Sequence, residues 1–94
     1  MNDAKILEVI NIYRKHFIEK GVKALEFTHG GMPKSKEEML AHCHGMLDKI
    51  ENFIKEGRRE KAFRWLGFIQ GCLWSTDQFS LDDLKNHNRP YAGG

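Results

Sequence analysis

The sequence predicts an all-α protein, a small bundle of three main helices followed by a short C-terminal helix. In each long segment apolar residues recur every three or four positions, which is the period of an amphipathic helix. No segment shows the apolar–polar alternation of a half-buried strand. The 94 residues, 40% hydrophobic and 30% charged, are enough for one globular core but too few for two. We therefore expect one helical domain over residues 1–94, ending in a short flexible tail.

The first helix is expected over residues 3–27. The apolar positions that share one face of its helical wheel are Ile6, Val9, Ile10, Tyr13 and Phe17. Ala24 and Phe27 return to that face and favour the long helix. Gly21 weakens a helix by roughly 1 kcal/mol relative to alanine, so a break at Gly21 is the alternative interpretation. Glycines and a proline at residues 30–33 end the segment in either case.

The second helix is expected over residues 35–56. Ser35 followed three residues later by Glu38 has the spacing of a capping box, and Gly57 is a natural stop. The short last helix is expected over residues 81–87, because Ser80 and Asp83 repeat the same spacing.

The third helix, expected over residues 59–75, carries apolar residues around nearly its whole circumference. Such a helix is typically buried by several neighbours. The chain also holds two Trp, six Phe and four Met, a large apolar content for so small an interior. We expect part of this surplus to form a homo-oligomer interface, made by Phe63, Gly67, Phe68 and Gly71. A monomer with the third helix simply central is the alternative.

The sequence lacks the usual patterns of catalytic and metal sites. His42 and His44 are two residues apart and point to opposite sides of a helix, and no HExxH or paired CxxC spacing is present. Cys43 and Cys72 lie within apolar helical patterns, without a neighbouring charge to lower a thiol pKa, so both are expected to be reduced core residues. We expect no enzyme activity, no cofactor and no metal.

The N-terminus lacks the uncharged apolar run of a signal peptide, and no window has the length and apolarity of a membrane span. We therefore expect a cytoplasmic protein, in the host cell if a phage encodes it, without a membrane partner.

Positive charge is concentrated in one segment of a nearly neutral chain, whose net charge is +2. Residues 58–75 carry four cations against the single carboxylate of Glu60, a local net charge of +3. The cations of this basic patch are Arg58, Arg59, Lys61 and Arg64. They favour contact with an anion or a phosphate. The alternative is a solvated helix start whose arginines pair with Glu56 and Glu60.

Other segments add candidate anion contacts. The loop at residues 28–36 combines two glycines with lysines directly before a helix N-terminus, which favours phosphate binding, although a plain turn explains the same residues. Asn88 and Arg89 follow the last helix and could donate hydrogen bonds to a ligand. The ring of Tyr13 or Trp74 could stack on a nucleotide base. The candidate ligand-binding residues are Arg64, Lys34, Lys36, His29, Tyr13, Trp74 and Arg89.

Two stretches, RWLGFIQGCLW at 64–74 and LDDLKNHNRP at 81–90, resemble small uncharacterised helical proteins encoded by bacteriophages and prophages. The resemblance covers roughly residues 33–90 and implies a phage accessory protein, without identifying an activity or catalytic residues. More weakly, the Pro-x-Ser-x-Glu motif at residues 33–37 is similar to the helix entry of phage proteins that sequester cyclic nucleotide signals.

The small size, the absence of a catalytic constellation, the surplus of apolar residues and the phage-like segment together lead us to expect a non-catalytic protein that counters host defence or takes over host machinery by binding. The expected mode is sequestration of a small anionic ligand, such as a cyclic nucleotide, by a homo-oligomer. Direct inhibition of a host protein is one alternative. The other, suggested by the basic patch, is a nucleic-acid-binding protein of replication or regulation.

Overall fold

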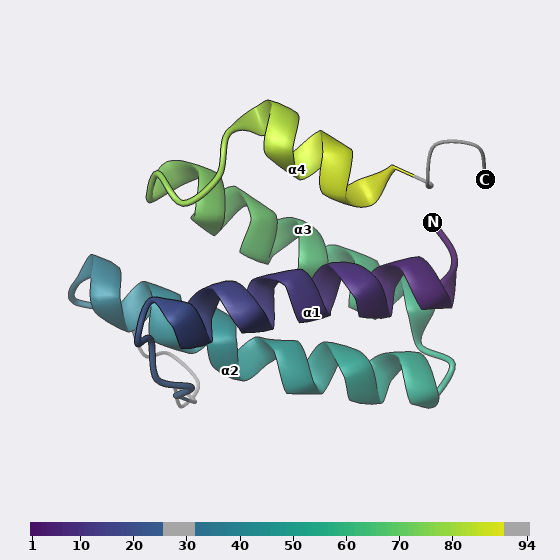
Figure 1. Cartoon of the computed structure of the whole chain (residues 1–94). Helices are drawn as coiled ribbons and strands as arrows, with labels where there is room; N and C mark the ends of the chain where they lie inside the picture. The colour runs from purple at the N-terminus through teal and green to yellow at the C-terminus, as the bar shows by residue number, and fades with distance from the viewer. Residues whose placement is uncertain (26–31, 90–94) are drawn as a thin grey trace.

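The computed structural model describes residues 1–25 and 32–89, which contain four helices and no strand (Figure 1). The helices are α1 (Asp3–Glu19), α2 (Lys36–Lys55), α3 (Arg59–Ser75) and α4 (Leu81–Asn88). The prediction of an all-α fold with three long helices and a short fourth is confirmed. Phe27, His29, the paired glycines of the 28–36 loop and residues 90–94 of the predicted tail lie outside the described residues.

The helices run up and down, with α1 and α3 both packed on α2 and α4 returning over α1 (Figure 1). One continuous apolar core joins them, and α4 contributes Leu84 to it. The side chains that are completely buried on the three long helices include Ile6, Val9, Ile10, Tyr13, Phe17, Cys43, Leu47, Ile50, Ala62, Ile69 and Leu73. The periodic apolar positions of the sequence therefore identify most of this core.

The first helix is shorter than the expected span of 3–27, because it ends at Glu19. The alternative interpretation, a break at Gly21, is confirmed. Gly21 has a φ of +71°, a conformation that glycine adopts without steric cost. The amide of Val22 donates to the carbonyl of Phe17 at 2.9 Å, which closes the end of the helix. Ala24 is exposed and lies outside the helix.

After Gly21 the chain passes closely over α2. The amide of Leu25 donates to the carbonyl of Ala41 at 3.0 Å. The Nδ1 of His44 lies 2.9 Å from the carbonyl oxygen of Val22, to which it donates. A Cβ atom at Gly45 would overlap the carbonyl oxygen of Leu25. A glycine at position 45 is therefore what allows this segment to lie against α2.

The start signal of α4 acts as expected, and that of α2 forms one of the two expected hydrogen bonds. Ser35 Oγ accepts a hydrogen bond from the Glu38 amide at 3.1 Å, and the Glu38 carboxylate accepts from the Lys34 amide instead of from Ser35. Ser80 and Asp83 form the complete reciprocal capping box, with bonds of 3.1 and 3.2 Å. Both helices begin within one residue of their predicted starts.

The expectation that neighbours bury α3 on several sides was wrong. Its buried residues, Ala62, Leu66, Ile69 and Leu73, all face the rest of the bundle. The opposite face is open, where Phe68 is 55% exposed and Trp74 is 53% exposed. The reason is that α3 packs mainly on α2, while α4 lies along only one edge of it (Figure 1).

Candidate ligand-binding surfaces

The predicted basic patch forms one surface at the turn between α2 and α3. Its four cations, together with Gly57 and Glu60, line a shallow depression of about 480 Å³. Arg58 occupies the N-cap position of α3, and no side chain caps that helix start. The positive end of a helix dipole with unsatisfied N–H groups thus adds to the charge of the side chains. This arrangement is chemically suited to an anion.

Three of the four cations already have partners within the chain. Arg58 lies 3.7 Å from Glu56, as the alternative interpretation expected, whereas Arg59 pairs with Asp3 at 2.9 Å. Lys61 lies over the ring of Phe53, 4.7 Å from its centroid. Arg64 is exposed and forms no ion pair with any residue that the structure describes. Arg64 is therefore the cation with the most freedom to meet a ligand.

Lys34, Lys36 and Trp74 do not join Arg64 within one protomer. Lys34 and Lys36 lie at the start of α2, and the basic depression lies beyond its far end, roughly 30 Å away for a helix of this length. Trp74 is ten residues from Arg64 on α3, about 15 Å along the helix axis. Arg89 follows the end of α4. The chain alone therefore does not assemble the predicted composite site.

Tyr13 is completely buried, so the expectation that a ligand could stack on its ring was wrong. Its hydroxyl accepts a hydrogen bond from Gln70 Nε2 at 2.9 Å and lies 3.0 Å from His87 Nδ1. Because the phenol oxygen accepts from Gln70, its own proton is available to His87 Nδ1. Burial raises the pKa of Tyr13 to about 12. The ring is a structural element of the core.

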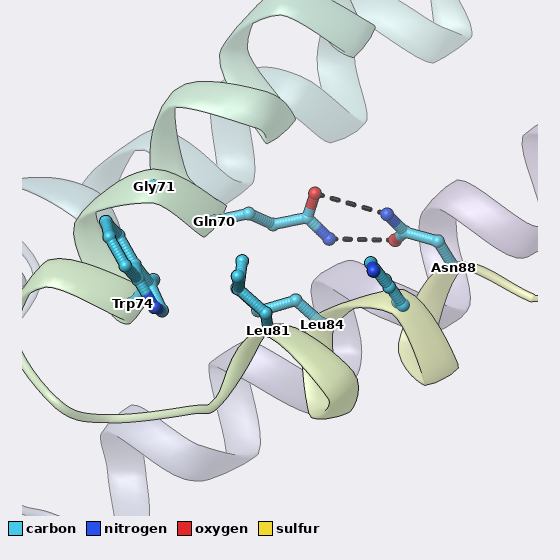
Figure 2. Close-up of a pocket in the computed structure, with 7 residues that line it drawn as sticks. Gln70, Gly71, Trp74, Leu81, Leu84 and Asn88 are labelled. Atoms are coloured by element: carbon cyan, nitrogen blue, oxygen red, sulfur yellow. Dashed lines mark hydrogen bonds between the residues drawn. The ribbon is translucent and has the colours of Figure 1, made fainter.

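Gln70 extends this polar network to the end of α4. Its amide and that of Asn88 form a reciprocal pair with bonds of 2.8 and 3.3 Å (Figure 2). The network joins α1, α3 and α4 through Tyr13, Gln70, His87 and Asn88. Phe79 completes it on the apolar side, with its ring centroid 5.6 Å from that of Tyr13 and 4.8 Å from that of His87. These contacts hold α4 in place.

A groove of about 260 Å³ lies between α3 and α4, with the Gln70–Asn88 pair at one end (Figure 2). Its walls are Gly71 and Trp74 on α3 and Leu81, Leu84 and Lys85 on α4. Leu81 is 53% exposed, as is Trp74. Sequence reasoning singled out the α3 wall and missed the α4 wall. Leu81 and Leu84, three residues apart on one face of a helix, were the feature of the sequence that indicates this wall.

The two cysteines are free, with Cys43 buried and Cys72 only half-buried. A hydrogen bond from the Cys43 thiol lowers the pKa of Cys72 to about 7, while the same bond and burial raise the pKa of Cys43. Sequence reasoning considered only a neighbouring charge as a cause of a lowered thiol pKa, whereas for Cys72 the cause is a neighbouring thiol. The position of Cys43 in the core agrees with the sequence.

No three His, Cys, Asp or Glu side chains of residues 1–25 and 32–89 are grouped so that they could hold a metal ion. No helix in those ranges has both the length and the apolar character needed to cross a bilayer. Comparisons with protein-family models, curated proteins and solved structures found no match.

Acidification is expected to destabilise the protein through His87. Burial lowers the pKa of His87, Asp83 opposes that shift, and Lys5 adds to it. The unfolded chain then takes up a proton more readily than the folded one, so stability is complete above the ordinary pKa of 6.5 and falls below it. Protonation also removes the acceptor that Tyr13 uses.

Urea unfolding between pH 8 and pH 5 checks this expectation. His87→Gln should flatten the loss of stability with falling pH. The pKa of His42 is lowered too, so His42→Gln measures how much of the pH dependence of stability comes from His42. An unchanged pH dependence in His87→Gln would contradict the assignment.

Proposed function

We propose that the protein is a non-catalytic phage accessory protein that counters host defence by sequestering a small phosphate-bearing ligand, such as a cyclic nucleotide, as a homo-oligomer. One observation carries the proposal: four cations surround the uncapped start of α3, and Arg64 among them has no ion pair within the described residues. Guanidinium groups and free helix N–H groups are the donors that phosphate oxygens favour.

The size of the depression supports a small ligand over a nucleic acid. The residues that line it extend only from Gly57 to Arg64. A nucleic-acid surface carries a basic patch or stripe that contacts several successive phosphates. Here the cations form one compact group, and the residues after α3 are acidic, with Asp77, Asp82 and Asp83.

Direct binding of a host protein is the second candidate, and the exposed α3–α4 groove favours it. Trp74 and Leu81, each 53% exposed, present large apolar surfaces beside the polar Gln70–Asn88 pair. Exposed tryptophan next to a polar rim is characteristic of protein interfaces. This candidate uses a different surface from the basic depression, so mutations separate the two functions.

Calorimetric titration with a panel of cyclic mono- and dinucleotides tests the proposed ligand class. Arg64→Glu should weaken binding about tenfold or more, because it replaces a phosphate donor with a repelling charge. Lys15→Glu makes the same change of net charge at an exposed position on α1 and should leave affinity nearly unchanged. Binding of none of the nucleotides, or equal losses in both variants, would overturn the proposal.

Recovery of the ligand after incubation tests the proposal that the protein binds the ligand without converting it. We expect the nucleotide to return intact and in stoichiometric amount when the protein is denatured. Conversion of the nucleotide into a product at more than one equivalent per chain would show turnover and overturn this part.

A further inference from the structure

We infer that the open face of α3 binds a second copy of this chain, with the two α3 helices antiparallel around a two-fold axis near Ile69. The inference extends the proposed function, because it assigns the surface through which the homo-oligomer forms. Only what it says about the ligand rests on the proposed function. It begins from the uneven distribution of exposed apolar side chains. Of the eight large ones in the described part, four belong to α3 and the first residue of α4: Phe63, Phe68, Trp74 and Leu81.

The face between these side chains permits close approach of another helix. No atom lies within 4 Å of where a Cβ would stand at Gly67 or Gly71, so neither glycine is needed for packing within the protomer. At 100° per residue, both glycines lie on the open side of α3, between Trp74 on one edge and Phe68 on the other. The result is a shallow strip with aromatic walls.

The order of residues along this strip is self-complementary. Gly67 and Gly71 stand two residues on either side of Ile69, and Arg64 and Trp74 stand five residues on either side. A two-fold axis at Ile69 therefore places Gly67 opposite Gly71 of the partner subunit, and Arg64 at the level of Trp74 of the partner subunit. Phe68, one residue from the axis, meets its own copy. A two-fold interface needs this kind of self-matching pattern.

The charges favour the antiparallel orientation. The first turns of α3 carry the net charge of +3, whereas Asp77 and Asp82 follow its end and form no ion pair with a described residue. An antiparallel pair sets the basic start of each α3 beside the acidic end of the other. A parallel pair would set like charges side by side.

The α3–α4 groove gives an aromatic side chain of the second copy a place to enter. Phe63 lies six residues from Ile69, so the antiparallel register carries Phe63 of the partner subunit to the level of Trp74 and Ser75. The groove there is lined by Gly71, Trp74 and Leu81 and is large enough for a phenyl ring. An exposed ring on one chain thus meets an apolar groove on the other.

The pairing leaves the proposed ligand site within each chain. The antiparallel register brings Arg64 to the level of Trp74 of the partner subunit, but on the opposite edge of the strip, so these two side chains do not form one site. Arg64 therefore meets a phosphate together with the other cations of its own basic patch.

Sedimentation equilibrium over a range of concentrations tests the pairing. The full chain should reach twice its mass of 10.9 kDa. Gly67→Leu should raise the dissociation constant about thirtyfold or more while the chain stays helical, because the new side chain fills the contact strip. Asn52→Leu adds a leucine to an exposed position of α2 and should leave the mass unchanged. A wild-type chain that stays monomeric at every concentration overturns the inference.

Cysteine crosslinking tests the orientation. In a background with Cys43→Ala and Cys72→Ala, a Gly67→Cys chain is mixed with a mass-tagged Gly71→Cys chain and oxidised. The antiparallel pair should give mainly disulfides between the two different chains. Predominant links between identical chains would indicate a parallel pair, and absence of all links would indicate another interface; either result overturns the inference.

The two proposals fail separately. A dimer of the expected register that binds no cyclic nucleotide would refute the ligand and leave the interface standing. A monomer that binds the nucleotide through Arg64 would refute the interface and leave the ligand standing.

Discussion

Replacing Gly45 with alanine is expected to lower the free energy of unfolding by about 1–3 kcal/mol. The direction is opposite to intrinsic helix propensity, which favours alanine by roughly 1 kcal/mol in the interior of a helix. The added methyl group would overlap the carbonyl oxygen of Leu25, and a backbone oxygen moves only if the whole segment moves. Displacement of residues 22–25 would break the Leu25–Ala41 and His44–Val22 hydrogen bonds.

Urea and thermal unfolding of Gly45→Ala measure this cost. Asn52→Ala is the control, because it places alanine on an exposed position of the same helix and should change stability by no more than about 0.5 kcal/mol. If Gly45→Ala were as stable as wild type, residues 22–25 would not lie against α2 as described.

Removing one hydroxyl in Tyr13→Phe is expected to destabilise the protein by about 1–3 kcal/mol. The ring and its packing stay, but Gln70 loses an acceptor and His87 Nδ1 loses its donor inside the bundle. Unsatisfied polar groups away from water cost more than the net value of the lost hydrogen bond. Because these bonds connect α4 to the rest of the bundle, we expect the change to act first on α4.

Hydrogen exchange locates this effect. The amides of α4 should exchange faster in Tyr13→Phe than in wild type, while those at the centre of α2 keep their protection. Ser75→Ala removes an exposed hydroxyl with a purely local bond and should shift stability by about 0.5 kcal/mol or less. Wild-type exchange in α4 of Tyr13→Phe would show that the network does not hold the helix.

The boundaries of the helices were predictable wherever a few neighbouring residues decide them. Ser35 and Ser80 accept hydrogen bonds from amides three residues later, so α2 and α4 start where the capping pattern predicts. Gly21 allowed two interpretations, since a glycine inside a helix is only mildly unfavourable. The packing of residues 22–25 against α2 made the break the stable outcome.

The candidate site was less predictable, because its geometry depends on which helices meet. The basic residues of 58–64 are close in sequence, and the structure keeps them together in one depression. Lys34 and Arg64 were grouped by their chemistry, yet α2 separates them. Tyr13 and Trp74 have similar helical surroundings in sequence, but one is completely buried and the other is half exposed.

The sequence by itself determined the all-α class, the core face of each helix and the N-caps of α2 and α4, since these depend on periodicity and on hydrogen bonds between near neighbours. Tertiary structure alone decided that α3 keeps an open face and that Tyr13, Gln70, His87 and Asn88 meet in one network. The physical reason is that burial and long-range hydrogen bonds depend on how whole helices pack. The stable packing is set by the apolar area buried and the polar groups hydrogen-bonded over the entire chain, not within one segment.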